Sequence, residues 1–180
     1  MIYRKAAKEQ SDYRRFMPSG SQTLDAVAGK DVIAEMGSTC LLLRMRLMSR
    51  VIASIYEEKL QPYGIGAAQF VSLVVIYQIQ PATRAQIGYL LHLDRSTLTR
   101  SLRAILAEGW VKEIQYQADA RCRPDGRSRP IVLTKAGKDL LRRAEPAWQS
   151  AQAQAKVMLG KNGVIAVTEI ANRIIDAGRP

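Results

Sequence analysis

Residues 93–110, LDRSTLTRSLRAILAEGW, carry the side chains best suited to recognition chemistry. Arginine, serine and threonine occupy one side of this stretch, with no carboxylate between Asp94 and Glu108. The candidate contact residues are Arg95, Ser96, Thr97, Thr99, Arg100 and Arg103. Guanidinium and hydroxyl groups can hydrogen-bond to the base edges displayed in the major groove of DNA. The pattern favours either a DNA-reading surface or an ordinary solvated helix face.

The apolar residues of the same stretch predict the helix that would position these groups. Leu98, Leu102 and Ile105 repeat at helical spacing, which indicates one face turned toward a core. Asp94 is expected to cap the helix N-terminus. The single histidine, His92, precedes it, and we interpret it as a turn residue rather than a metal ligand or catalytic base.

Two further helices are predicted before this one. Residues 67–79 form an apolar run that is shorter than the roughly 20 residues needed to span a bilayer, so we expect a buried helix capped by Gly66. Thr83, with Gln86 three positions later, has the pattern of a capping box and marks the start of the second helix.

Two strands are expected after the candidate recognition helix, at 111–117 and 129–134. Pro130 restricts the second to a sheet edge or a strand start. The connecting residues form a basic hairpin tip, which could reach a narrow minor groove, where negative potential is concentrated. The candidate DNA contacts of this wing are Arg121, Arg123, Asp125, Arg127 and Arg129.

The order of elements predicts a mainly α fold with a small β-hairpin wing. A winged helix-turn-helix domain is expected over 63–145. Segment 38–62 has apolar residues on more than one helical face, and segment 146–180 ends in an amphipathic helix over 164–175. Both have more apolar surface than one small domain needs, which predicts that they form a helical dimerisation region. Within the second segment, Pro146 should kink the helix and GKNG at 160–163 should break it.

Residues 1–37 are predicted to be a basic, loosely ordered extension, although a short helix over 23–36 and an alternative start at Met36 stay open.

The charge balance points toward nucleic acid. The chain has 180 residues, with 27 Lys and Arg against 16 Asp and Glu, a net charge of +11. Such a balance favours a polyanionic partner, with DNA ahead of an anionic membrane surface. The sequence contains no HExxH, GxSxG or Gly-rich phosphate loop, so we expect no enzymatic activity, cofactor or metal.

Cysteine usage and the absence of an export signal in this sequence favour a cytoplasmic protein without a membrane partner. Cys40 and Cys122 are too few and too distant to suggest a disulfide framework. The arginine pair at 14–15 has a twin-arginine appearance, but no apolar segment follows it.

The motif LDRSTLTRSLRAILAEGWV followed by PDGRSRPIVLTKAG resembles the MarR family of bacterial transcriptional regulators. The segment YGIGAAQFVSLVVI is also similar to the second helix of that family, and the resemblance covers about 38–178. It implies a homodimer that binds a pseudo-palindromic operator in double-stranded DNA, most often as a repressor. It further implies that Asp125 orients Arg127 toward the minor groove, although this wing is longer than usual and contains Cys122.

The resemblance also implies release from DNA by a small aromatic or phenolic effector. Candidate pocket residues are Met48, Arg50, Tyr56 and Phe70, because adaptable apolar side chains and one guanidinium could hold an aromatic acid. The alternative is that the apolar residues among them are ordinary core.

Two alternative functions remain open. One branch of the family senses hydroperoxides through a cysteine near the start of the first helix, and Cys40 could act as such a redox sensor. Aligned through SRVIASIY, however, Cys40 is two positions away from that cysteine, or about 200° around a helix. The other alternative is a non-specific architectural protein that binds DNA through charge alone.

Overall fold

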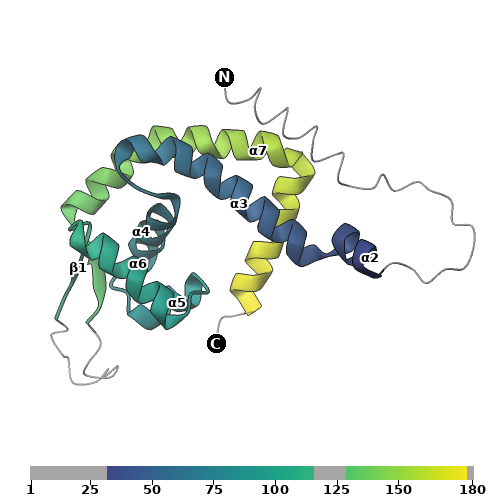
Figure 1. Ribbon diagram of the computed structural model, residues 1–180. Helices are drawn as coiled ribbons and strands as arrows, with labels where there is room; N and C mark the ends of the chain where they lie inside the picture. Colours follow the sequence, from purple (N-terminus) through teal and green to yellow (C-terminus); the bar gives the residue numbers. More distant parts are fainter. Residues whose placement is uncertain (1–31, 116–128, 178–180) are drawn as a thin grey trace, which may run out of the picture. The chain divides into compact units, whose positions relative to one another are not determined.

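A computed structural model describes residues 32–115 and 129–177 of the chain. The described elements, in chain order, are α2 (Val32–Thr39), α3 (Leu41–Leu60), the short 3-10 turn Gln61–Tyr63, α4 (Ala67–Ile79), α5 (Arg84–Leu90), α6 (Arg95–Ala107), β1 (Val111–Glu113), β2 (Ile131–Leu133) and α7 (Lys135–Ala177) (Figure 1). The chain divides into two compact units, Met1–Arg50 and Val51–Pro180. The division falls inside α3, within the segment 38–62 that the sequence predicts as one helical region.

The first unit contains α2 and the first half of α3. Residues 32–37, which the sequence assigns to the N-terminal extension, lie in α2, and over 32–36 this agrees with the short helix that the sequence left open. The hydroxyls of Ser38 and Thr39 donate to the Glu35 carbonyl at 3.1 and 2.7 Å, within the last turn of this helix. Large apolar side chains in the first half of α3 are exposed: Leu41, Leu42, Leu43, Met45 and Leu47.

The second unit contains the hydrophobic core. Its fully buried side chains come from α3, α4, α5, α6, β2, α7 and the loop before α4, and they include Leu60, Ile65, Leu73, Ile76, Ile87, Leu102, Ile105, Ile131 and Leu140. The predicted caps are confirmed at α4, where Gly66 is the N-cap, and at α5, where Thr83 and Gln86 form a capping box. Each helix therefore begins where its sequence signal places it.

The wing strands form a two-stranded antiparallel sheet in which Val111 pairs with Leu133 and Glu113 with Ile131. They are shorter than the predicted 111–117 and 129–134. Pro130, which has no N–H, lies just before β2, and its carbonyl accepts from Ile114 at 2.8 Å. On the other edge of β2, Ala82 forms an isolated bridge to Ile131, so a residue shortly before α5 joins the sheet.

The start of α7 packs tightly against the segment between α6 and β1. Thr134 caps α7, since its Oγ1 accepts from the Gly137 N–H at 3.1 Å. The same hydroxyl donates to the Gly109 carbonyl at 2.7 Å. A Cβ atom at Gly137 would overlap the Trp110 carbonyl oxygen, so this position has no room for a side chain.

Helix α7 is interrupted once along its length. Gly160 has φ 66° and ψ 169°, which confirms the predicted break in GKNG, and the helix changes direction there (Figure 1). At Pro146 the backbone keeps helical dihedral angles, so the helix is interrupted at the glycine and continues through the proline. After the break, the apolar residues remain exposed: Ile165, Val167, Ile170, Ile174 and Ile175.

Candidate nucleic-acid interface

Helices α5 and α6 are joined by a tight turn. His92 in this turn has φ 48°, the left-handed conformation that its interpretation as a turn residue requires. Its N–H donates to the Tyr89 carbonyl at 3.1 Å, and the Leu93 N–H donates to the Gly88 carbonyl at 2.9 Å. These two bonds end α5 and set the direction in which α6 begins.

Asp94 caps α6, as the sequence predicts. Its Oδ1 accepts from the backbone N–H groups of Ser96 and Thr97, both at 2.9 Å. The hydroxyls of Ser96 and Thr97 also donate to this carboxylate, at 2.6 and 2.7 Å. These hydrogen bonds, led by the one from the Ser96 side chain, hold the pKa of Asp94 well below its usual range.

The outward face of α6 therefore carries two kinds of polar group: hydroxyls that hydrogen-bond within the helix and its cap, and exposed guanidiniums. The hydroxyl protons of Ser96 and Thr97 are directed to Asp94, and the Thr99 hydroxyl donates to the Arg95 carbonyl at 2.7 Å. The guanidiniums of Arg95, Arg100 and Arg103 are exposed. Arginine thus supplies the outward-facing donors of this helix, while the hydroxyls mainly stabilise its first turns.

The inward face of α6 anchors it to the core. Leu98, Leu102 and Ile105 are buried, as their spacing predicts. One polar contact adds to this packing, since the hydroxyls of Ser72 on α4 and Ser101 on α6 lie 3.4 Å apart. The exposed arginines therefore stand on a helix that is fixed by its opposite face.

The wing candidates are only partly described. Arg121, Arg123, Asp125 and Arg127, together with Cys122, lie outside the described residues. Arg129 is exposed, and its Nη1 lies 3.7 Å from Oε2 of Glu113.

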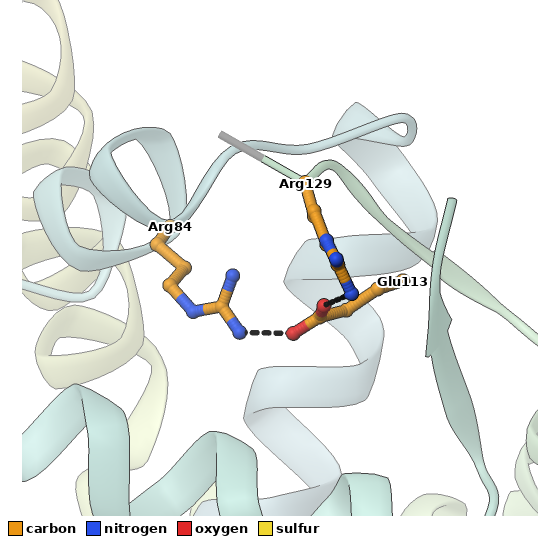
Figure 2. Close-up of polar contacts among 3 residues, drawn as sticks. All are labelled: Arg84, Glu113 and Arg129. Carbon is orange, nitrogen blue, oxygen red and sulfur yellow. Dashed lines mark hydrogen bonds and ion pairs between the residues drawn. The ribbon is translucent and has the colours of Figure 1, made fainter. Parts of the chain in front are cut away.

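Glu113 also binds Arg84, the first residue of α5 (Figure 2). The sequence pattern indicates neither Arg84 nor Glu113 as a functional candidate. An isolated charge in a strand or helix gives no signal of its partner 29 residues away.

The effector candidates are divided between the two compact units. In the second unit, Tyr56 and Phe70 are half-buried against the core, and the Tyr56 hydroxyl donates to the Gln152 side chain. Burial raises the pKa of Tyr56. In the first unit, Met48 is half-buried and Arg50 is exposed.

Cys40, directly before α3, is a half-buried free thiol. Within 32–115 and 129–177, no group of three or more His, Cys, Asp or Glu side chains is placed to hold a metal ion. None of the described helices alone is long and apolar enough to cross a membrane, although one bent pair, Val32–Tyr63 with Ala67–Ile79, meets that test of length and composition.

The sequence matches a family model and a bacterial relative. Residues 65–122 match the MarR family model. Over 95 residues the chain is 30% identical to an uncharacterized HTH-type transcriptional regulator, YwoH, from Bacillus subtilis. That match spans 53% of this chain and 64% of YwoH.

Solved structures share the fold over most of the chain. The M. tuberculosis transcriptional regulator MosR in complex with DNA matches with a TM-score of 0.62 and 27% identity, covering 77% of this chain and 96% of MosR. A MarR variant from E. coli complexed with operator DNA matches with a TM-score of 0.63 and 20% identity, covering 82% of this chain and 99% of that protein. These likenesses confirm the predicted fold, a mainly helical winged helix-turn-helix.

Proposed function

We propose that the chain, whose residues 65–122 match the MarR family model, is a sequence-specific, double-stranded DNA-binding transcriptional regulator of that family. The observation that carries the proposal is the outward face of α6. Three exposed arginines stand there on a helix whose other face is buried in the core. The DNA-bound state of MosR, at 27% identity, supports the same role for this chain.

In the proposed complex, α6 enters the major groove. Arg95, the first residue of this helix, and Arg100, further along it, are proposed to reach base edges, where arginine pairs with guanine through two hydrogen bonds. Arg103 is proposed to contact a phosphate. The wing arginines Arg121, Arg123 and Arg127 are proposed to contact the adjacent minor groove.

We further propose that the protein acts as a homodimer on a pseudo-palindromic operator. Exposed apolar side chains in the first half of α3 and after the break in α7 support this proposal, because a second copy would remove them from water. Two recognition helices would then lie about 34 Å apart, one turn of DNA.

Repression and its release by an aromatic effector complete the proposal. The supporting features are the half-buried Tyr56 and Phe70, and the hydrogen bond from Tyr56 to Gln152. A bound aromatic acid could replace Gln152 as the acceptor of the Tyr56 hydroxyl. A thermal-shift screen with benzoate and its hydroxylated derivatives tests this step. If no compound moves the melting temperature, the effector proposal fails while DNA binding stands.

The decisive experiment for DNA binding is a fluorescence-anisotropy titration. The probe is the DNA upstream of the gene that encodes this chain, with a scrambled duplex of equal length as the comparison, at two salt concentrations. A specific regulator should prefer its operator by about 10³ or more. Equal affinities that both collapse with salt would instead indicate the architectural alternative.

A further inference from the structure

Two arginines from different parts of the chain converge on one carboxylate. Glu113 is the last residue of β1, Arg84 is the first residue of α5, and Arg129 comes two residues before β2. Arg84 donates to Oε1 of Glu113, while Arg129 lies 3.7 Å from Oε2, so each carboxylate oxygen faces a different guanidinium (Figure 2). The group has one negative and two positive charges.

The carboxylate is the least exposed of the three side chains. Glu113 is 27% exposed, against 42% for Arg84 and 67% for Arg129. Both guanidiniums are therefore more accessible to an approaching polyanion than the carboxylate is. A guanidinium has five N–H donors, so a contact with Glu113 leaves others available for a second anion.

Backbone hydrogen bonds already join these elements without the charges. Ala82 and Ile131 exchange two bonds, at 3.0 and 2.8 Å, and the Ile114 N–H donates to the Pro130 carbonyl at 2.8 Å. Partly exposed ion pairs generally contribute little to folding stability. The three charged side chains are thus better explained by a role in positioning the two guanidiniums than by a contribution to folding stability.

We propose that Arg84 and Arg129 form a binding site for a DNA backbone phosphate at the base of the wing, and that Glu113 is a positioning residue for both guanidiniums. The inference rests on the proposed DNA-binding function and adds Arg84 and Glu113 to it. Phosphate accepts charge-assisted hydrogen bonds from arginine, often two from one guanidinium. Such a contact reads no base and instead fixes the register of the protein on the duplex.

The test measures affinity for a scrambled duplex by fluorescence anisotropy across a salt series, because a phosphate contact requires no particular sequence. The variants are Arg84→Gln, Arg129→Gln and Glu113→Gln. Arg142→Gln is the matched control, since Arg142 is an exposed arginine paired with Asp139 on α7. Melting temperatures of all four variants verify that the fold is retained.

Arg84→Gln and Arg129→Gln should each weaken binding by about three- to tenfold and reduce the slope of log K against log salt by about 0.9, as expected for one lost phosphate. The control should leave that slope unchanged. Arginine variants that behave like the control would overturn the phosphate site.

Glu113→Gln separates positioning from simple charge. Loss of the Glu113 carboxylate makes the protein more positive, so net charge alone predicts tighter binding to DNA. Loss of positioning instead predicts binding about two- to fivefold weaker, with a smaller slope of log K against log salt. Unchanged or tighter binding would overturn the positioning role. If the unaltered protein binds neither the scrambled nor the upstream duplex, the proposed function itself fails, and this inference fails with it.

Discussion

The apolar side chains of α6 are buried, whereas those of the last part of α7 are exposed. Leu98, Leu102 and Ile105 on α6 are buried by other parts of the same unit, which leaves arginine on the outside. After Gly160, Ile170 and Ile174 of α7 remain exposed. Helix α6 is therefore stabilised within its own unit, while the end of α7 would be covered by the proposed second copy of the chain. Mutations should accordingly affect folding near α6 and association near the end of α7.

The largest effect on folding is expected at Gly137, where α7 meets the segment between α6 and β1. Gly137→Ala places a Cβ against the Trp110 carbonyl oxygen, a backbone atom that cannot rotate away. We expect a loss of about 3 kcal/mol in the free energy of unfolding, measured by urea denaturation. Gly37→Ala is the control, because nothing lies within 4 Å of the position that its Cβ would take and alanine favours a helix. Equal stability of the two variants would show that the contact relaxes freely.

The features that depend on near neighbours could be predicted from the sequence. Asp94, Thr83 and Gly66 are recognisable as caps, and His92 as a turn residue, because each signal involves residues within one helical turn. The apolar face of α6 follows from its spacing in the same way.

Features that depend on distant residues were not predictable. The Gln80 side chain accepts from the Leu133 N–H, and Arg84 meets Glu113, because folding brings separate segments together. The sequence also did not indicate that the Ser96 and Thr97 hydroxyls turn back to Asp94. The structure therefore favours the arginines over the hydroxyls as the DNA-contacting groups of the candidate surface.

The next largest effect is expected on association. Ile170→Asp places a charge in the exposed apolar part of α7, and a twofold interface would contain that charge twice. The dimer dissociation constant should rise at least about 100-fold, since burying one isoleucine is worth about 1.5–3 kcal/mol. Sedimentation velocity measures the change, and Asn172→Asp, an exposed polar position on the same helix, is the control. A dimer unaffected by Ile170→Asp would place its interface elsewhere.

A smaller effect, confined to DNA binding, is expected at α6. Arg100→Ala removes an exposed guanidinium while the buried face stays intact, so the melting temperature should hardly change. The preference for operator over scrambled duplex should fall by about 10-fold or more, the usual effect of losing a base contact. Arg142→Ala on α7 should leave that preference unchanged. A uniform loss on both duplexes would reassign Arg100 to a phosphate.

The smallest effect concerns the acid stability of the first turn of α6. The hydrogen bonds to Asp94 lower its pKa below the ordinary value of 3.8, so its contribution to folding is fully present above that value. That contribution is lost as the pH falls from there toward the folded-state pKa. Asp94→Asn removes the titrating group while keeping an N-cap side chain. Its unfolding free energy should therefore fall less than that of the unaltered protein between about pH 5 and about pH 2.

Glu108→Gln is the matched control for this measurement, because it removes a carboxylate from the opposite end of the same helix. Urea denaturation at each pH compares the three proteins. If Asp94→Asn and Glu108→Gln follow the same pH dependence, the cap adds no acid sensitivity of its own. In that case the buried face of α6, rather than its hydrogen-bonded first turn, determines how firmly the arginines are presented.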